Sequence, residues 1–560
     1  MKMSGAKALV EALKKENVKI VFGLPGGAIL PVYDVLYNDG AIRHILARHE
    51  QGAAHMADAY ARVSGRVGVC MVTSGPGATN TVTGIAVAYM DSSPMLTITG
   101  QVPTYMIGRD AFQEADIVGI VTPITKETFQ PRRAREVPKA VKAAFHIAST
   151  GRPGPVLIDL PRDVQTEECE MEFPEKVELL GYNVKVEPDM LQVRRAVEAL
   201  MNAEKPVIIA GGGVIRSNAS QELCALSEQL MIPVVTTLMG KGAMPENHPL
   251  CLGMIGMHGR YEANKIVTEA DVILAVGTRF SDRSTGRFDE FAKNAVVIHV
   301  DIDPSEISKN VPAHIPVICD AKIGLRRILE EAKKKIAKNG RTEWVKRVEE
   351  VKEEAKSVYD LEGDLKPGML MKMLRKMLPE DAIITTGVGQ NQMWAALFFD
   401  VYHPRTFITS GGLGAMGFGL PAAVGARAAA PDKVVVDIDG DGGFMMTSQE
   451  LVTSMAEDLP VITIILNNGW LGMVRQWQSL FYGKRYMATN LRGNPDFAKF
   501  AEIHGAQGFT VQSYDDFEKA VKESLASDVT SIIDVKISPD EKVFPFVPPG
   551  KSLKEVILHE

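Results

Sequence analysis

Two predicted strand ends in the last third of the chain carry oxygen-bearing side chains. An apolar run at 434–438 ends in DGDGG at 439–443, and a second run at 461–466 ends in NNG at 467–469. Parallel strands would place both ends at one edge of a sheet, where α/β folds bind ligands. Carboxylate, amide and backbone oxygens suit Mg²⁺, which usually keeps substrate phosphates in its shell. Each motif alone is more often only a turn, but the 24-residue spacing 443–466 between two strands argues against that reading.

Glu50 is a second candidate, in the motif RHEQG near the N-terminus. It follows a predicted strand at 42–47 and precedes an Ala-rich predicted helix at 52–63. A carboxyl in apolar surroundings can share a proton with a ring nitrogen of a bound cofactor. The ordinary interpretation is a helix-start carboxylate near the positive end of the helix dipole. A zinc site is disfavoured, because His49 and His55 are six residues apart and HExxH is absent.

Helical and strand patterns alternate along most of the chain. Apolar strand candidates separated by helical spacing predict an α/β fold with three doubly wound parallel-sheet domains. A Glu-rich stretch at 166–188 is interpreted as a linker, and a Lys- and Glu-rich stretch at 330–365 as a solvated helix and linker. The domains are therefore predicted at 1–170, 186–340 and 362–540, followed by a tail at 541–560.

Composition excludes several classes of protein. The chain has 560 residues, and 62 Lys and Arg against 69 Asp and Glu give a formal net charge of −7. A mildly acidic chain without a basic run is a poor nucleic-acid binder. Five cysteines without a CxxC pair disfavour a disulfide framework and indicate a reducing, cytoplasmic location. No signal peptide or membrane span is expected.

Longer sequence motifs, spread over almost the whole chain, resemble those of a known family. The GDG…NN spacing is similar to the thiamin-diphosphate signature. The segments RHEQGAAHMADAYAR, TSGPGATNTVTGIA, GRDAFQEADIVGIV, GTRFSDRSTG, GLGAMGFGLPAAVGA and LGMVRQWQSLFY resemble the catalytic subunits of the acetohydroxyacid synthase (acetolactate synthase) family. The resemblance implies domains of the thiamin-diphosphate enzyme type: a pyrimidine-binding domain with an activating Glu50, a central FAD-type domain, and a diphosphate- and Mg²⁺-binding domain.

The same resemblance implies specific residue roles. Mg²⁺ would be held by Asp441, Asn468 and the carbonyl of Trp470. Thiamin diphosphate would also contact Pro76, Asn80, Val388, Gly389, Gln390, Asn391, Gly414, Met416, Gly440, Gly442, Gly443, Leu471, Gly472, Met473 and Val474. Reaction-centre and substrate residues would be Glu50, Gly27, Phe112, Gln113, Lys126, Arg283 and Trp477. Arg283 would bind the carboxylate of the second substrate, since guanidinium presents a planar fork.

The resemblance also implies a bound FAD. Its role would be structural, because the family's reaction is redox-neutral. Its contacts would be Arg162, Gly211, Gly212, Gly213, Thr237, Leu238, Met257, His258, Gly259, Gly277, Arg279, Asp282, Arg283, Asp301, Ile302, Asp320 and Ala321. The glycine triplet after a strand is by itself a weak signal.

The implied reaction is decarboxylation of pyruvate and transfer of a two-carbon hydroxyethyl unit to pyruvate or 2-oxobutyrate. This is the first common step of branched-chain amino-acid biosynthesis. A homodimer or homotetramer is implied, with each cofactor between two chains, and a small regulatory subunit is a possible partner. Ser281 and the tail depart from the family pattern and leave the preferred acceptor open.

Two alternatives stay open. One is another thiamin-diphosphate enzyme of the same fold, such as a catabolic acetolactate synthase without FAD or a simple 2-oxoacid decarboxylase. Glyoxylate carboligase is disfavoured, because that enzyme lacks the glutamate found here at position 50. The other is a non-catalytic nucleotide-binding flavoprotein, against which the joint presence of Glu50, Asp441 and Asn468 argues.

Overall fold

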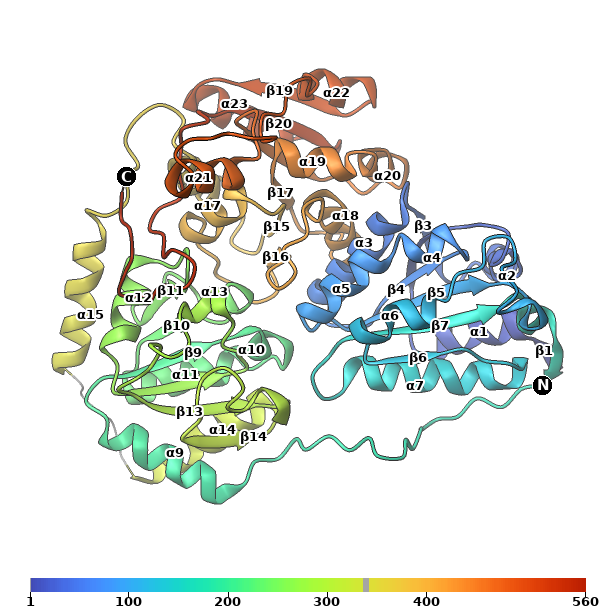
Figure 1. Ribbon diagram of the computed structural model, residues 1–560, viewed down its shortest axis with the longest axis horizontal. Coiled ribbons are helices and arrows are strands. Elements are labelled where there is room, and N and C mark those ends of the chain that lie inside the picture. The colour runs from blue at the N-terminus through green and yellow to red at the C-terminus, as the bar shows by residue number, and fades with distance from the viewer. Residues whose placement is uncertain (1, 336–341, 560) are drawn as a thin grey trace.

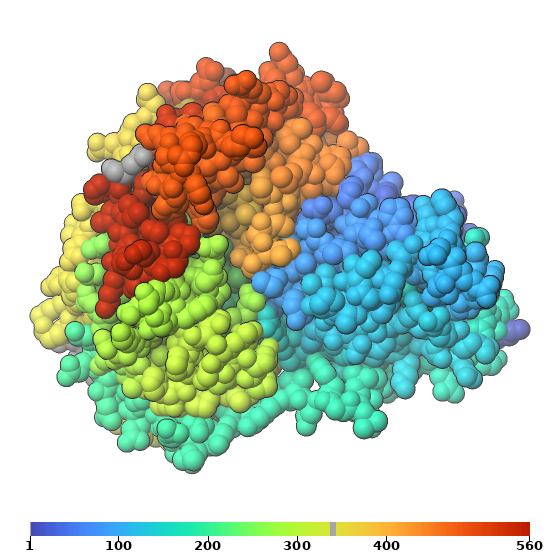
Figure 2. Space-filling model, in the orientation of Figure 1, coloured from blue at the N-terminus to red at the C-terminus, as the bar shows by residue number. Residues whose placement is uncertain are grey.

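Three six-stranded parallel sheets organise the molecule, a computed structural model that describes residues 2–335 and 342–559 (Figure 1). Each sheet is interleaved with helices along the chain, so the predicted α/β fold is confirmed. The N-terminal domain lies to the right in Figure 1, the central domain at the lower left and the C-terminal domain at the top, and Figure 2 shows their surfaces in the same orientation. Of the predicted domain ends, 340 falls outside the described residues.

The N-terminal sheet has the order β3-β2-β4-β5-β7-β6. Its strands are β2 (Ile20–Leu24), β3 (Arg43–Leu46), β4 (Gly68–Val72), β5 (Met95–Gln101), β6 (Glu127–Phe129) and β7 (Pro155–Pro161). The helices are α1 (Gly5–Lys15), α2 (Leu30–Asp39), α3 (Glu50–Ser64), α4 (Pro76–Thr79), α5 (Val82–Met90), α6 (Ile117–Val121), α7 (Val137–Ser149) and α8 (Arg162–Thr166). β1 (Lys2–Ser4) pairs antiparallel with β8 (Glu168–Glu170), inside the stretch interpreted as a linker.

The central sheet has the order β11-β10-β9-β12-β13-β14. Its strands are β9 (Pro206–Ala210), β10 (Val234–Thr236), β11 (Cys251–Met254), β12 (Val272–Val276), β13 (Val296–Asp301) and β14 (Ile315–Ile318). The helices are α9 (Met190–Asn202), α10 (Gly212–Arg216), α11 (Ser220–Leu230), α12 (Tyr261–Glu269), α13 (Asp282–Thr285), α14 (Ala321–Lys335) and α15 (Thr342–Ala355).

Helix α15 differs from the solvated helix predicted for its sequence. Trp344, Val348 and Val351 recur on one helix face and are buried in the core that α15 shares with α12. The Trp344 ring nitrogen donates to the carbonyl of Pro206 over 3.0 Å. The charged residues therefore cover only the outer face, and three apolar residues at helical spacing dock the inner face.

The C-terminal sheet has the order β16-β15-β17-β18-β20-β19. Its strands are β15 (Ile383–Thr386), β16 (Phe407–Thr409), β17 (Val435–Gly440), β18 (Ile462–Asn467), β19 (Gln507–Val511) and β20 (Ser531–Lys536). The helices are α16 (Pro367–Met377), α17 (Gln390–Phe398), α18 (Gly419–Ala429), α19 (Asp441–Thr447), α20 (Glu450–Ala456), α21 (Gly472–Phe481), α22 (Phe497–Ile503) and α23 (Tyr514–Leu525). None of the helices in the described part of the chain has the length and hydropathy of a membrane span.

A buried ion network joins the N-terminal and C-terminal domains, where α3 packs against α18. Arg62 pairs with Asp58 at 2.5 Å and with Asp91 at 3.1 Å, and all three side chains are almost fully buried. Its guanidinium also donates to the carbonyl of Thr409 over 2.7 Å. Desolvation of such charges is costly, so the network is stable only while every partner is present.

We predict that Arg62→Met destabilises the protein strongly. The substitution leaves Asp58 and Asp91 buried without their counter-ion, which costs about 3–5 kcal/mol. Urea unfolding followed by far-UV circular dichroism should show a lower midpoint. Arg287→Met, which removes an ion pair exposed on both sides, is the matched control and should leave the midpoint unchanged. Equal midpoints for Arg62→Met and the wild type would contradict the prediction.

Candidate cofactor-binding site

The two predicted strand ends lie side by side, because β17 and β18 are neighbouring parallel strands. Asp441 is the first residue of α19, directly after β17, and is 1 % exposed. Asn494 donates its amide to Asp441 Oδ2 over 3.0 Å, and burial raises the pKa of Asp441 to about 6. One buried carboxylate thus marks the edge of the sheet where the sequence predicted a metal site.

Asn468 lies just beyond β18 and supplies a second oxygen at this edge. Its Nδ2 donates to Gln390 Oε1 over 3.2 Å, and its Oδ1 accepts from the backbone N–H of Trp470 over 2.9 Å. The amide oxygen keeps a second lone pair. A carboxylate, an amide oxygen and the carbonyl of Trp470 form a donor set that fits a hard cation such as Mg²⁺, with the remaining positions open to phosphate oxygens.

Glycines keep the backbone close together around these donors. A Cβ at Gly472 would lie 2.1 Å from Gln390 Oε1 and 2.6 Å from Asn468 Nδ2. A Cβ at Gly442 would lie 2.9 Å from a methyl of Leu471 and 3.5 Å from the methyl of Met416. The space over the metal donors is therefore a cradle that side chains would fill, as a phosphate-binding loop requires. Gly440, Gly443 and Asn391 also border this cradle.

Two buried carboxylates beneath the cradle were not singled out in the sequence. Asp437 and Asp439 are buried residues two positions apart in β17, and each has one oxygen without a hydrogen-bond partner among the described residues. Burial raises the pKa of Asp439 to about 7, and burial together with Asp439 raises the pKa of Asp437 well above its usual range. The motif DIDGDGG contains both, so their position beside Asp441 was the available signal.

Glu50 occupies the start of α3 and is 7 % exposed. Asn80 donates its amide to Glu50 Oε2 over 2.9 Å, which leaves Oε1 facing Gly77 in the turn that begins with Pro76. These three predicted cofactor residues, Glu50, Pro76 and Asn80, are therefore brought together. The remaining oxygen is free to exchange a proton with a bound ring nitrogen.

The backbone before Glu50 is held by a carboxylate from the C-terminal domain. Glu450 in α20 is fully buried, and its carboxylate accepts from the N–H groups of His49 at 2.9 Å and Arg48 at 3.1 Å. Thr453 donates to the same carboxylate over 2.7 Å. Burial raises the pKa of Glu450, and these hydrogen bonds oppose the rise. Glu450 is thus a positioning residue for Glu50 that sequence reasoning missed.

The segment DAFQE lies against the same turn. Gln113 has a left-handed backbone (φ +58°), and its Cα would be 2.9 Å from a Cβ at Gly75, next to Pro76. Phe112 is 88 % exposed, and no heavy atom lies within 4 Å of the position that a Cβ at Gly27 would take. Phe112 and Gly27 thus have open space beside them, whereas Gln113 packs against the backbone at Gly75.

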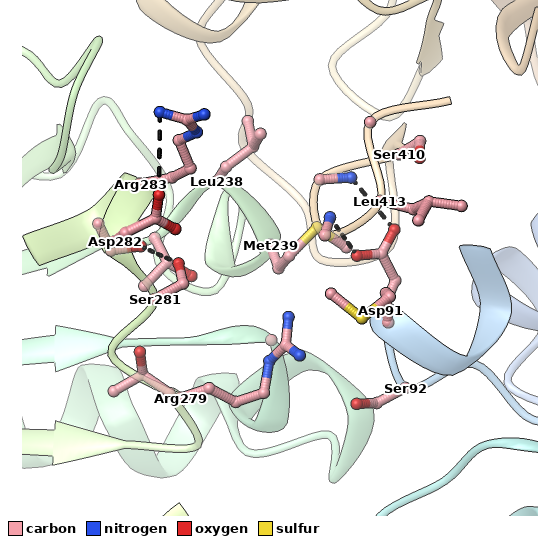
Figure 3. Close-up of a pocket in the computed structure, with 18 of the residues that line it drawn as sticks. Asp91, Ser92, Leu238, Met239, Arg279, Ser281, Asp282, Arg283, Ser410 and Leu413 are labelled. Carbon is pink, nitrogen blue, oxygen red and sulfur yellow. Dashed lines mark hydrogen bonds and ion pairs between the residues drawn. The ribbon is translucent and has the colours of Figure 1, made fainter. Parts of the chain in front are cut away.

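A large cavity opens between the three domains and has a volume of about 1390 Å³. The predicted residues that line it are Gly212, Gly213, Thr237, Leu238, Met257, His258, Gly277, Arg279, Asp282, Arg283, Asp301, Ile302, Asp320, Ala321, Val388, Gly389, Gly414, Met473, Val474 and Trp477. Figure 3 shows Arg279 and Arg283 on the central-domain side of the cavity, across from Asp91 and Ser92 and from the loop that carries Ser410 and Leu413. The cavity thus joins most of the predicted FAD contacts to part of the predicted diphosphate site.

Several predicted residues lie outside this cavity. Gly211 and Gly259 do not line it, and Arg162 is exposed at the start of α8. Arg152 lines the cavity instead, paired with Glu306 at 2.8 Å. Lys126 does not line the cavity either: its ammonium donates to the carbonyls of residues 147 and 150 at the end of α7, and burial lowers its pKa to about 8. A substrate-channel role for Lys126 stays a prediction.

The glycine-rich loop at the cavity is anchored by Asp91. The N–H groups of Gly411 and Gly412 donate to its carboxylate over 3.1 and 2.7 Å (Figure 3). The same carboxylate pairs with Arg62. Asp91 therefore connects the buried ion network to a loop on the cavity wall, a link between distant residues that no sequence spacing indicates.

Arg283 and Trp477 face the cavity from opposite domains. The Arg283 side chain is 55 % exposed, and its nearest charged neighbour, Asp282, is 3.9 Å away. A partly free guanidinium at a cavity wall suits a small carboxylate. Trp477 in α21 packs edge-on against Phe481 at 6.4 Å, and Phe481 in turn contacts Phe546 of the tail.

Comparisons with known proteins agree with this arrangement. Models of the thiamine pyrophosphate enzymes match residues 3–120 (N-terminal TPP binding domain), 193–328 (central domain) and 387–535 (C-terminal TPP binding domain). The three domains are therefore those of a thiamine pyrophosphate enzyme.

Relatives at higher identity narrow the family. The chain is 52% identical to the probable acetolactate synthase large subunit of Methanocaldococcus jannaschii, covering 99% of this chain and 95% of the relative. It is 48% identical to the acetolactate synthase large subunit of Corynebacterium glutamicum (99% and 90%) and 43% identical to the acetolactate synthase isozyme 3 large subunit of Escherichia coli (99% and 98%). The chain belongs to the family of acetolactate synthase large subunits.

We predict that Glu450→Gln slows cofactor activation without weakening cofactor binding. The amide cannot accept every hydrogen bond that the carboxylate accepts. Loss of one charge-assisted hydrogen bond corresponds to a factor of about 10–100 in rate. The exchange rate of the thiamin C2 proton should fall by that factor. The affinity for thiamin diphosphate should not change, because the donors around Asp441 are intact.

Glu343→Gln is the matched control, since that carboxylate is 86% exposed on α15. It should exchange the C2 proton at the wild-type rate. A wild-type rate in Glu450→Gln as well would show that Glu450 does not position Glu50.

Proposed function

We propose that this chain is the catalytic subunit of an acetolactate synthase. It would decarboxylate pyruvate and transfer the hydroxyethyl unit to pyruvate or 2-oxobutyrate, at the first common step of branched-chain amino-acid biosynthesis. The observation that carries the proposal is the buried Glu50 carboxyl held by Asn80, in a chain 43% to 52% identical to acetolactate synthase large subunits. Membership of the family supplies the substrate class.

The metal and cofactor would be held at the C-terminal sheet. Asp441, Asn468 and the Trp470 carbonyl would bind Mg²⁺, and the glycine cradle would receive the diphosphate. Thiamin diphosphate, when bound, supplies the electron sink that decarboxylation needs. Met416, beside Gly442, would pack against the cofactor rings. Glu50 would hold a proton at Oε1 and exchange it with the pyrimidine ring, while Asn80 fixes Oε2.

The second substrate would be bound across the cavity. Arg283 would hold its carboxylate through the guanidinium fork. Trp477 would shape the acceptor pocket, and Phe112 and Gln113 would line the space for the first 2-oxoacid. Exclusion of water favours transfer over protonation, and α21 with the tail would cover this side of the cavity.

The central domain would hold FAD in a structural role. Gly211 and Gly213 approach Gly277 so closely that a Cβ on either would lie 2.1 or 2.6 Å from its backbone. Gly213 and Gly277 line the cavity, so backbone without side chains would face a pyrophosphate there. Asp301, whose pKa burial raises to about 7, and Asp320 line the same wall. The volume of about 1390 Å³ is large for a small ligand and suits a dinucleotide.

The complete site would need two chains. Glu50, Pro76, Asn80, Gly27, Phe112 and Gln113 are absent from the wall of the cavity that Arg283, Trp477 and Val388 line. A homodimer or homotetramer would bring one chain's Glu50 to its partner's Asp441. A small regulatory subunit is a further expected partner, as the large-subunit names of the relatives imply. Five free cysteines support a reducing, cytoplasmic location.

Product analysis tests the proposal. With thiamin diphosphate, Mg²⁺ and FAD, the protein should convert pyruvate to acetolactate, and added 2-oxobutyrate should give 2-aceto-2-hydroxybutyrate. Glu50→Gln should lower the rate by about 10²–10⁴-fold, because its amide cannot exchange the proton. Acetaldehyde as the main product would indicate a simple decarboxylase. Retained FAD without any turnover would indicate a non-catalytic flavoprotein.

Hybrid dimers test the shared site. We predict that Glu50→Gln and Asp441→Asn proteins are each nearly inactive, but that random mixing of their subunits restores about a quarter of wild-type activity. Half of the dimers are then hybrids, and each hybrid has one site with both native carboxylates. Activity after subunit exchange is the measurement. No recovery despite proven exchange would place both residues of a site in one chain.

A further inference from the structure

A second cavity lies where the three domains meet, next to the large cavity, with which it shares part of its wall. Its volume is about 510 Å³. Lys19 and Arg66 of the N-terminal domain, Arg216 at the end of α10, and Arg405 before β16 all line it. Each domain therefore contributes at least one cation to this cavity, which we call the joint cavity.

The charge of the joint cavity is not balanced by its own wall. Among the described residues, Glu16 is the one carboxylate that lines it, and Glu16 already pairs with Lys142 at 2.8 Å. No carboxylate in the described chain lies within 4 Å of the charged nitrogens of the four cations. Four cationic residues against one carboxylate that is already paired give this wall a net positive charge, within a protein whose net charge is −7.

The two inner cations are bound only by neutral groups. Arg405 donates to Asn218 and to the carbonyls of Arg62 and Arg216, and Arg216 donates to the carbonyl of Asp91 over 3.0 Å. Burial, assisted by the charge of Arg62, lowers the pKa of Arg216 to about 9. These neutral partners fix the guanidinium groups in place without an ion pair. The carboxylates whose charge reaches Arg216, Asp58 and Asp91, already pair with Arg62.

We propose that the joint cavity binds a small phosphorylated molecule. Guanidinium forks match phosphate oxygens, and lysine adds a point charge. Tyr60, Phe145 and Pro94 add apolar wall on the N-terminal side, which favours an organic phosphate over the inorganic ion. The volume lies in the range of small-ligand sites.

The position of the cavity gives such a ligand a structural effect. Arg216, Ser149 and Pro153 line both the joint cavity and the large cavity. An occupant that binds Arg216 would also join the three domains across their common boundary. Binding in the joint cavity is therefore expected to change the affinity of the large cavity for its own ligand, and the coupling must be reciprocal.

Calorimetric titration of the holoenzyme tests the proposal. The protein, saturated with thiamin diphosphate, Mg²⁺ and FAD, is titrated with inorganic phosphate, with pyrophosphate and with AMP. We expect saturable binding, with AMP tighter than phosphate. Lys19→Gln/Arg66→Gln should raise the dissociation constant for AMP at least about tenfold. Both side chains are exposed, so the variant should fold normally.

Lys499→Gln/Lys519→Gln removes the same charge from exposed lysines elsewhere, and it should bind AMP as the wild type does. If both double variants lost AMP affinity equally, the effect would come from the net charge of the protein rather than from the joint cavity, and the proposal would be overturned. AMP binding that is seen only in protein prepared without FAD would place the ligand in the large cavity, and no saturable binding of AMP would leave the joint cavity without a phosphate ligand. Either result overturns it. Because binding is measured without turnover, the outcome is separate from that of the product analysis.

Discussion

The buried pairing of Arg62 with Asp58 and Asp91 is the constraint on which the arrangement of the two outer domains depends. It lies within the packing of α3 against α18, where no water can replace a missing partner. A charge network of this kind is weak evidence for stability but strict about geometry, because any displacement leaves a charge unsolvated. The fold can therefore hold the loop after β16 in only one place relative to α3.

Two carboxylates, one from each domain, bind the backbone of the other domain across the same interface. Glu450 of the C-terminal domain binds the backbone before Glu50, and Asp91 of the N-terminal domain binds the backbone of Gly411 and Gly412. Helix α3 is thus fixed at its start by Glu450 and near its end by Arg62. Each domain therefore positions the functional backbone of the other, and the hydrogen bonds fix Glu50 and the glycine-rich loop relative to each other.

Local chemistry was readable from the sequence, and long-range positioning was not. Asp441 and Asn468 follow buried strands, so the rule that parallel strands share one carboxyl edge was enough to bring them together. Asp91, Glu450 and Arg152 carry no such local mark, because their roles depend on partners tens to hundreds of residues away. The apolar face of α15 that carries Trp344 was missed because the prediction relied on the charge composition of the segment, which ignores the spacing of its apolar residues.

The irregular tail shows how a segment without secondary structure can still determine a site. Arg475 and Gln476 of α21 are bonded to Asp540 and to the backbone of Val543, and further along the tail Val547 donates to the carbonyl of Met257 over 2.8 Å. Phe546 stacks on His258, and this burial lowers the pKa of His258 to about 3, so the ring is neutral and can pack as an apolar group. The tail therefore ties α21 to the central domain. The position of Trp477 over the cavity is then set by the contacts that the tail makes with α21 and with the central domain, as well as by its own helix.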